Sequence, residues 1–444
     1  MTELVLTLQI ERMAYGADAI AHTPEGKTIF VSGAVPGDTA EVEVIQDGSN
    51  FSKGRVTHIV ESSKKRVAPP CPYATICGGC PWGVLSKEAQ LEAKRSSVVD
   101  ALVRIGHFET AKAESLVADC ERPSADWGYR NKVELAVSWQ KGRLVVGMHA
   151  KDGSVIKVDS CPLLQDKHAK LVKAVSGALG YLGGTNELGL ERVGIRVALH
   201  TKDIEIALWG KPGAFPRAQA AKVLGDATHA NSMVRILTKG LKKARRITGV
   251  EVLSGKGYWT ERIAGQRMAL SAPSFFQVNT LGAERLIELV LAGLDPQPDE
   301  EAMDLYCGAG TFTLPLAKRC EFVSAVEASG PAVRDLRRNL DNAQLQNVDV
   351  IGGDAGREFP DSDANLIVVD PPRAGLAENV VTQLSEQRVR RIAYVSCDPA
   401  TLARDLARFC AIGNYRPLRI TPVDLFPQTY HVECVVLMSR GDVK

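Results

Sequence analysis

The alternation of strand-like and helical runs between Glu300 and Ile412 constrains the fold of this chain more than any other feature. Short apolar runs typical of buried strands alternate with amphipathic stretches typical of helices. The expected strands are Ala302–Tyr306, Phe322–Glu327, Val348–Gly352, Ala364–Asp370 and Arg391–Ser396. The expected helices are Thr311–Arg319, Pro331–Gln344, Ala377–Glu386 and Ala400–Ile412. This order predicts an α/β domain in which helices cover both faces of a parallel sheet.

The last segment of the chain breaks this alternation. Arg416–Phe426 and His431–Ser439 have strand character and are joined by a short turn around Pro427 and Gln428, which predicts a β-hairpin. A parallel sheet closed by an antiparallel hairpin resembles the class I, Rossmann-like methyltransferase fold. We therefore expect a domain of that class over residues 266–444.

The first part of the chain predicts two further domains. Short alternating runs separated by turn residues predict a small OB-like β-barrel over residues 1–62; these runs are Leu4–Glu11, Lys27–Ser32, Thr39–Ile45 and Gly54–Val60. The basic and proline-rich segment 62–70 reads as a linker. Residues 63–265 carry a helical stretch and several strand-like runs, which predicts an α+β domain; the runs include Lys132–Trp139, Leu144–Ala150, Val193–His200 and Ile204–Trp209. The helix expected within 84–108 is a candidate to pack on the domain of residues 266–444.

Composition sets only broad limits on function. Apolar residues make up 45% and charged residues 24% of the 444 positions, which is ordinary for a soluble protein of two or three domains. The net charge of +2 neither supports nor excludes a nucleic-acid partner, because binding needs only a local basic surface. The chain contains no run of the ~18–20 apolar residues that a membrane-spanning helix needs. Its first residues lack the features of a signal peptide. We expect a cytoplasmic protein without a membrane partner.

A glycine-containing loop follows the first strand of the predicted parallel sheet. In the segment Asp304-Leu-Tyr-Cys-Gly-Ala-Gly-Thr311 the two glycines permit a tight turn and a close approach of the backbone to a ligand. Glu327 ends the next strand, where a carboxylate can accept hydrogen bonds from ribose hydroxyls. Asp354 follows the third strand, where it could lie beside an adenine ring. The G-x-G spacing is shorter than the full dinucleotide fingerprint, so an ordinary strand–turn–helix connection is the alternative.

Two motifs at strand ends carry candidate catalytic side chains. Asp370-Pro-Pro-Arg373 ends the fourth strand, and ligands of open α/β sheets bind at such carboxyl ends. Cys397 ends the fifth strand and precedes a helix that Asp398 can cap. The positive end of that helix predicts a lowered thiol pKa, although the Asp398 charge acts in the opposite sense. A buried, unreactive core cysteine is the alternative.

Glu433 makes the reactive interpretation of Cys397 more probable than the core one. It lies near the start of the last strand, and an antiparallel last strand begins at the same sheet edge where the parallel strands end. Cys397, Asp370 and Glu433 are therefore expected on one rim, as a nucleophile facing a carboxylate base. His431 alternates with Glu433 and is a candidate second acid or base; a surface histidine is equally compatible.

Four of the ten cysteines form a patterned group that predicts a metal site. Cys71, Cys77 and Cys80 are closely spaced, and Cys161 lies far away in Ser160-Cys-Pro-Leu163. Four thiolates can hold an iron–sulfur cluster or a zinc ion, and the spacing alone fits both. Unligated core thiols are the third interpretation.

The motifs together resemble the RNA uracil-5 methyltransferase family. The resemblance covers nearly the whole chain and rests on Asp370-Pro-Pro-Arg373, Ser396-Cys-Asp-Pro399, His431-Val-Glu433 and Phe275-Phe-Gln-Val-Asn279. It implies that Cys397 is the nucleophile and Glu433 the base. It also implies that an S-adenosyl-L-methionine site is lined by Gln277, Tyr306, Glu327, Asp354 and Asp370, together with Thr311, which stands where family members often carry Asn.

The resemblance extends to the other domains. The N-terminal barrel resembles the TRAM domain, and the cysteine pattern resembles that of members with a [4Fe–4S] cluster, although Pro81 and Gly83 stand where glutamines are expected. Tyr129-Arg130-Asn131-Lys132 resembles a motif near the RNA, in which basic side chains contact phosphate and the aromatic ring stacks on a base. The barrel and cluster together favour 23S ribosomal RNA over transfer RNA, acted on by a monomer.

The residue types agree with the implied reaction. Carbon 5 of uracil is a weak nucleophile until a thiolate adds to carbon 6, and a base must later remove the carbon 5 proton. The uridine must be flipped or single-stranded to reach the rim. A noncatalytic RNA-binding protein with a structural cluster is an alternative of another class, and an amino methyltransferase is a third; neither requires both Cys397 and Glu433.

Overall fold

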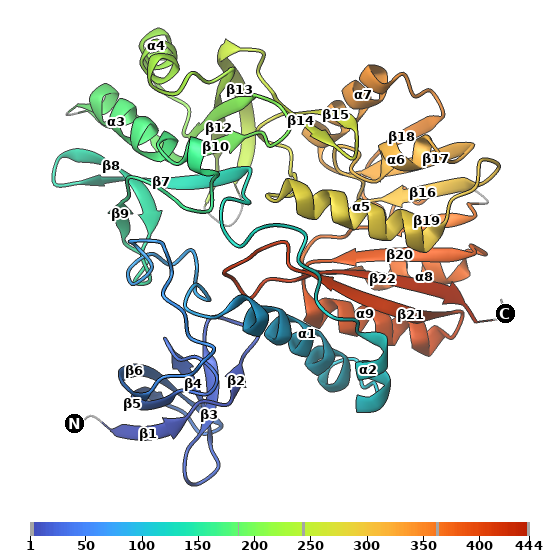
Figure 1. Ribbon diagram of the computed structural model, residues 1–444. Helices are drawn as coiled ribbons and strands as arrows, with labels where there is room; N and C mark the ends of the chain where they lie inside the picture. Colours follow the sequence, from blue (N-terminus) through green and yellow to red (C-terminus); the bar gives the residue numbers. More distant parts are fainter. Residues whose placement is uncertain (1–3, 185, 242–244, 361–363, 442–444) are drawn as a thin grey trace.

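The computed structural model describes residues 4–184, 186–241, 245–360 and 364–441. Three large sheets and one two-stranded sheet account for the strands of this part of the chain. In Figure 1 the N-terminal sheet (within residues 5–61) lies beneath the central sheet (within 132–255), and the C-terminal sheet (within 301–440), called the catalytic sheet below, lies beside both. Helix α1 (Lys87–Arg104) runs from the N-terminal sheet toward the catalytic one.

The N-terminal sheet has the strand order β1-β5-β6-β4-β3-β2. Its two end strands are consecutive in the chain, so the sheet curls around a core that includes Leu8, Ile29, Val31 and Val42. The strands are β1 (Val5–Gln9), β2 (Arg12–Met13), β3 (Ala19–His22), β4 (Thr28–Ser32), β5 (Thr39–Asp47) and β6 (Phe51–Glu61). Strand β3 was not predicted because three of its four residues are buried, which removes the alternating pattern.

Helix α1 links the N-terminal sheet to the catalytic one. It begins at Ser86, whose hydroxyl accepts a hydrogen bond from the amide of Ala89. Its buried residues Val98 and Leu102 belong to the same apolar core as Leu402 and Leu406 of the catalytic domain. The short helix α2 (Thr110–Leu116) follows it and adds Leu116 to this core.

The central sheet has the order β13-β12-β11-β10-β7-β8-β9 and carries α3 (Leu171–Gly183) and α4 (Arg217–Thr228). Four of its strands match the sequence prediction closely; the full set is β7 (Lys132–Gln140), β8 (Arg143–His149), β9 (Val155–Lys157), β10 (Leu190–Val197), β11 (Ile204–Gly210), β12 (Ser232–Lys239) and β13 (Arg246–Gly255). A 3-10 turn spans Asp166–His168. The hairpin of β14 (Trp259–Ile263) and β15 (Gln266–Leu270) leads to α5 (Thr280–Leu294).

The catalytic sheet has the order β18-β17-β16-β19-β20-β22-β21. Its first five strands are parallel, and β22 runs antiparallel to both neighbours. The strands are β16 (Glu301–Leu305), β17 (Phe322–Glu327), β18 (Val348–Gly352), β19 (Leu366–Val369), β20 (Arg391–Ser396), β21 (Tyr415–Val423) and β22 (Glu433–Arg440). The helices are α6 (Thr313–Ala317), α7 (Gly330–Ala343), α8 (Glu378–Glu386) and α9 (Pro399–Ile412). The predicted Rossmann-like domain, with its closing hairpin, is confirmed.

The structure differs from the prediction at the tip of that hairpin. Strand β21 stops at Val423 and strand β22 starts at Glu433. The connection is therefore a nine-residue loop instead of a short turn. Asp424 leaves the ladder because its buried carboxylate pairs with lysines of α1. No helix in the described part of the chain is both long enough and apolar enough to cross a bilayer.

Candidate active site

Cys397 and Glu433 lie next to each other at one rim of the catalytic sheet. Ser396 is paired with Cys434 in the β20–β22 ladder, so the next position along β20 and the first position of β22 meet at the same edge. Asp370 follows β19, which is the other neighbour of β20. The antiparallel course of β22 is therefore what brings a carboxylate beside the thiol.

The Cys397 thiol is less acidic than the sequence predicted. Asp398 caps α9 as expected, because its carboxylate accepts hydrogen bonds from the amides of Ala400 at 3.0 Å and Thr401 at 3.1 Å. The pKa of Cys397 is nevertheless raised to about 12, first by burial and then by the negative charge of Glu433. The prediction of a lowered pKa was wrong, since burial and the Glu433 charge act in the opposite direction.

Glu433 and Asp370 form an electrostatically coupled acidic pair. Glu433 is buried, and both its burial and the Asp370 charge raise its pKa well above the ordinary value. Asp370 keeps a partly exposed surface, but its carboxyl is surrounded by protein, and burial followed by the charge of Asp304 raises its pKa to about 8. At neutral pH the rim therefore retains protons that ordinary carboxyls would have lost.

Arg373 supplies a positive charge that favours the ionised forms of Cys397 and Glu433. It lowers the pKa of both Cys397 and Glu433, against the larger effect of burial. Its guanidinium lies 3.3 Å from Nδ1 of His431. Burial and then the Arg373 charge lower the pKa of His431 to about 4, so this imidazole is neutral at physiological pH and is not a proton donor in its charged form.

The glycine loop after β16 is held by the carboxylate of Glu327. That carboxylate accepts hydrogen bonds from the amides of Gly308 at 2.9 Å and Ser329 at 2.6 Å. Gly310 has a φ of 98°, and a Cβ there would lie 2.4 Å from Leu314, so no larger residue fits without displacing that side chain. The loop and Glu327 thus form a preorganised surface of backbone and carboxylate.

Two buried acceptor atoms, one of them in the strand that precedes this loop, have no hydrogen-bond partner among the described residues. They are Oδ1 of Asp304 and Oε1 of Gln277. The other oxygen of Asp304 accepts a hydrogen bond from Thr313 at 2.6 Å, and burial raises the pKa of Asp304 to about 7. Unsatisfied buried acceptors are costly unless a ligand supplies donors. These atoms fit a ligand that carries amino or hydroxyl groups and a positive charge.

Asp304 was not assigned a role from the sequence. The sequence did contain a signal for it, because an acidic residue stands in an otherwise apolar strand just before the glycine loop. Tyr306, which was assigned, has a φ of 63°. Burial and the charge of nearby Asp354 raise the pKa of Tyr306 to about 12, and Thr311 lies half-buried just before α6.

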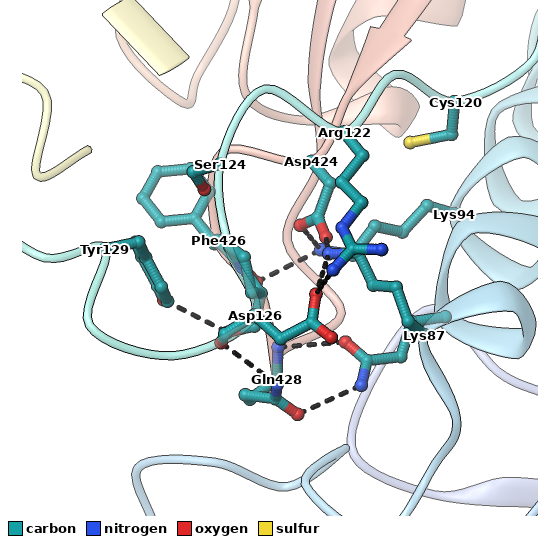
Figure 2. A network of polar contacts seen from close by, with 12 residues as sticks. Lys87, Lys94, Cys120, Arg122, Ser124, Asp126, Tyr129, Asp424, Phe426 and Gln428 are labelled. Atoms are coloured by element: carbon teal, nitrogen blue, oxygen red, sulfur yellow. Dashed lines mark hydrogen bonds and ion pairs between the residues drawn. The ribbon is translucent and has the colours of Figure 1, made fainter. Parts of the chain in front are cut away.

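The loop between β21 and β22 is anchored by buried charges on α1. Lys87 and Lys94 both pair with the carboxylate of Asp424, and Lys94 and Asp424 are completely buried (Figure 2). Lys94 also donates a hydrogen bond to the carbonyl of Phe426 at 3.0 Å. The signal in the sequence is the polar stripe formed by Lys87, Gln90 and Lys94, which share one face of α1.

Amide groups extend the same anchor to the end of the loop. Nε2 of Gln90 donates to Oε1 of Gln428 at 3.0 Å, and the backbone N–H of Gln428 donates to Oε1 of Gln90 at 2.9 Å. The Gln428 side chain also donates to the carbonyl of Asp126 at 3.1 Å (Figure 2). The loop that leads into Glu433 is thus fixed by residues from the N-terminal half of the chain.

Tyr129 contributes to this anchor, and Asn131 holds the segment before α5; neither side chain faces solvent. The buried Tyr129 hydroxyl donates to the carbonyl of Pro427 at 3.0 Å (Figure 2), and the Asn131 amide donates to the carbonyl of Gln277 at 2.9 Å. The expectation that Tyr129 stacks on an RNA base does not fit this arrangement, because its ring is buried. Arg130 and Lys132 are partly exposed, although Lys132 pairs with Glu134.

The four patterned cysteines share one neighbourhood. Burial and then the charges of Cys161, Cys77 and Cys71 raise the pKa of Cys80 to about 12. The amide of Gly79 donates to the sulfur of Cys77 at 3.4 Å. As they stand, no three His, Cys, Asp or Glu side chains within the described ranges converge closely enough to hold a metal ion.

Comparison with known proteins gives concordant matches. A family model described as tRNA (uracil-5-)-methyltransferase matches residues 219–363 and 355–441, and a TRAM domain model matches residues 4–57. An RNA methyltransferase of Gloeobacter violaceus, itself uncharacterized, is 34% identical over 98% of this chain and 96% of its own. Another, from Thermosynechococcus vestitus, is 34% identical over 96% of this chain and 97% of its own.

A solved structure shares the fold across all domains. The tRNA (uracil-54, C5)-methyltransferase of Pyrococcus abyssi, in complex with S-adenosyl-L-homocysteine, aligns with a TM-score of 0.74 at 24% sequence identity. The alignment covers 97% of this chain and 99% of that one.

Proposed function

The chain belongs to the RNA uracil-5 methyltransferase family, and from this membership we propose that it methylates carbon 5 of a uridine in RNA, with Cys397 as nucleophile and Glu433 as base. The observation that supports this assignment most directly is the β20–β22 register, in which Ser396 pairs with Cys434 at the rim of the sheet. A thiol and a buried carboxyl at one rim suit a reaction that needs both groups on one pyrimidine ring.

The methyl donor is S-adenosyl-L-methionine, which supplies an electrophilic methyl group on a positively charged sulfur. The buried oxygens of Asp304 and Gln277 and the carboxylate of Glu327 suit its amino, ribose and cationic groups. Tyr306, Thr311, Asp354 and Asp370 complete the proposed set.

The reaction proceeds through a covalent bond between protein and RNA. The Cys397 thiolate adds to carbon 6 of the uracil, which places electron density on carbon 5. Carbon 5 accepts the methyl group, and Glu433 then removes its proton. The electrons of that C–H bond re-form the C5–C6 double bond as the thiolate leaves, so Cys397 is regenerated.

Arg373 and the acidic pair control the protons of this cycle. Arg373 favours the thiolate, because it lowers the pKa of Cys397. Glu433 must lose its proton before it can act as a base, and its raised pKa then makes its carboxylate a stronger base than an exposed glutamate. Asp370 loses its proton more readily once a cationic group lies beside it.

We propose 23S ribosomal RNA as the substrate, on the basis of the TRAM barrel combined with the cysteine pattern. Transfer RNA is the second candidate, because the family model and the solved P. abyssi enzyme both carry transfer-RNA names. In either RNA the uridine must leave its stack to reach Cys397.

We also propose that Cys71, Cys77, Cys80 and Cys161 hold a [4Fe–4S] cluster. The shared neighbourhood of the four thiols and the amide of Gly79 directed at Cys77 support it. Protein purified without oxygen should be brown and contain about four irons per chain by the stoichiometry of such a cluster, and Cys80→Ala should lose both. A colourless protein that contains zinc would contradict the proposal.

The function is tested by methylation of defined RNAs. Purified protein is incubated with S-adenosyl-L-methionine and with unmodified 23S or transfer-RNA transcripts, and nucleosides are identified by mass spectrometry. The proposal predicts 5-methyluridine in the 23S transcript and none with Cys397→Ala. A methyl group on an exocyclic nitrogen would contradict the proposed chemistry, and methylation of transfer RNA alone would contradict the proposed substrate.

A further inference from the structure

A tyrosine of the N-terminal barrel reaches the catalytic rim. Tyr15 lies in the turn between β2 and β3, which is closed by a hydrogen bond from the amide of Ala14 to the carbonyl of Asp18 at 3.0 Å. The Tyr15 ring meets the ring of Tyr430 edge to face, with centroids 5.6 Å apart and an interplanar angle of 83°. Tyr430 immediately precedes the His431–Glu433 motif.

The contact is part of a rigid junction between the barrel and the catalytic domain. Nε1 of the fully buried Trp82 donates to the carbonyl of Gly16 at 2.9 Å, and the Trp82 amide donates to the carbonyl of Gln428 at 3.0 Å. Tyr430 packs against the apolar core of the barrel. Trp82 is therefore hydrogen-bonded both to the turn that carries Tyr15 and to the loop between β21 and β22.

Tyr15 lies against the loop that leads to Glu433, and part of this residue is accessible. It retains 37% of its surface exposed, whereas most aromatic residues of the junction are buried or half-buried. Burial, followed by the charge of Asp398 and then Cys434, raises its pKa, so its hydroxyl stays neutral. A partly exposed, neutral aromatic side chain next to the loop that precedes Glu433 is suited to stacking on a nucleobase.

The ring system continues from Tyr430 to the catalytic motif. The rings of Tyr430 and His431 lie 4.2 Å apart with an angle of 44°, and His431 meets Phe426 at 5.9 Å. Arg373 contacts His431 and is exposed, so a phosphate-binding cation adjoins the aromatic rings. Aromatic rings beside an exposed arginine are typical of surfaces that bind single-stranded nucleic acid.

We infer that Tyr15 and Tyr430 form a stacking platform for the RNA base next to the target uridine, so that the barrel completes the substrate site. The inference rests on the proposed function. When the uridine is flipped toward Cys397, its neighbour loses a stacking partner, and the Tyr15 ring replaces that partner. The barrel thus selects an unstacked RNA segment in addition to holding its backbone.

The inference is tested by a comparison of Tyr15→Leu, Tyr15→Phe and the control Tyr181→Leu with the wild type. Tyr181 is 72% exposed on α3, away from the catalytic sheet (Figure 1). The substrate is total RNA from cells that lack the protein, and kcat, KM for RNA and KM for the methyl donor are measured. Tyr15→Leu should raise KM for RNA roughly tenfold to a hundredfold, the usual effect of losing a stacking aromatic, without change in kcat or donor KM.

The two other variants identify the cause. Tyr15→Phe keeps the ring and should behave like the wild type, as should Tyr181→Leu. An unchanged KM in Tyr15→Leu would overturn the inference, and so would equal damage in Tyr15→Phe, which would assign the effect to the hydroxyl.

A binding measurement separates this inference from the proposed function. Retention of the same RNA on filters without methyl donor should weaken in Tyr15→Leu by a similar factor, whether or not methyl transfer occurs. A wild type that transfers no methyl group while Tyr15→Leu loses RNA binding would contradict the proposed function alone.

Discussion

Cys397 is subject to opposing electrostatic effects. The start of α9 and the guanidinium of Arg373 favour its thiolate, whereas burial and the carboxyl of Glu433 disfavour it. Burial and the carboxyl are stronger, so the resting site keeps the thiol protonated. A thiol that stays protonated is less prone to unproductive alkylation and oxidation than a thiolate.

The first prediction concerns the pH at which this thiol ionises. Alkylation of Cys397 by iodoacetamide, followed by peptide mass spectrometry, should still increase above pH 9, because the thiol pKa is raised to about 12. Asp370→Asn removes a negative charge and should shift the profile to lower pH. Arg373→Met removes the opposing cation and should shift it to higher pH. A midpoint below that of a free thiol, ~8.5, would contradict this account.

At the residue scale, strand ends were sufficient to predict which side chains meet. Cys397, Asp370 and Glu433 gather at one rim because parallel strands end, and an antiparallel strand begins, at the same edge. The thiol pKa could not be predicted in the same way, because it depends on burial by segments distant in sequence. The burial of Tyr129 was missed for the same reason, since its partner Pro427 is nearly 300 positions away.

At the scale of elements, α1 holds the loop of residues 424–432, which leads to Glu433, through buried polar contacts. Lys94 is buried with Asp424, and desolvation lowers the lysine pKa even beside this carboxylate. Asp424 pairs with both Lys87 and Lys94, so it is the removal of this carboxylate that leaves an uncompensated buried charge, on Lys94. The loop that leads to Glu433 therefore depends on a helix more than 300 positions earlier in the chain.

The second prediction tests these contacts. Asp424→Leu leaves the completely buried Lys94 without its carboxylate and should destabilise the catalytic domain by about 3–5 kcal/mol, measured as the free energy of unfolding in urea. The control is Lys65→Met, because Lys65 pairs with Glu92 of the same helix at an exposed site, where loss of the pair should cost about 1 kcal/mol or less. Equal effects of the two substitutions would show that the buried pair does not hold the loop.

The alternating strands and helices from β16 to α9 followed from periodicity, whereas the strand β15 and the helix α5 were not predicted. The hairpin loop did not follow from periodicity, because Asp424-Leu425-Phe426 has the composition of a strand and leaves the ladder only to meet Lys87 and Lys94. The lysines on the α1 stripe were the available signal. Nothing in the sequence pairs that stripe with residue 424.

At the scale of the whole molecule, the barrel and the catalytic domain form one substrate surface. Trp82 lies between them and contacts both through hydrogen bonds. Arg12 of β2 also pairs with Asp100 of α1 at 2.9 Å. The TRAM barrel is thus fixed at the rim, in contact with the loop that carries Tyr430.

The third prediction tests this docking. Trp82→Ala should cost about 3–5 kcal/mol of the stability of the junction. The linker 62–70 should then become sensitive to limited proteolysis and KM for RNA should rise, with donor affinity unchanged. Trp139 is 37% exposed on β7, so Trp139→Ala should leave the proteolysis pattern as in the wild type. Resistance of the linker in Trp82→Ala would show that the barrel is held by other contacts.

Sequence patterns predicted a barrel, a central domain and a Rossmann-like domain, but not how they dock. Docking depends on single residues such as Trp82 and Tyr15, whose partners are set by the tertiary fold.

Covalent capture of RNA by Cys397 tests the central claim most directly. RNA that contains 5-fluorouridine accepts the thiol and the methyl group, but carbon 5 then carries fluorine instead of a removable proton, so Glu433 cannot complete the cycle. With S-adenosyl-L-methionine present, we predict a protein–RNA adduct that survives denaturing electrophoresis and maps to Cys397 by peptide mass spectrometry. Cys397→Ala should form none. Full methylation activity on natural RNA by Cys397→Ala, or an adduct on another cysteine, would contradict the account.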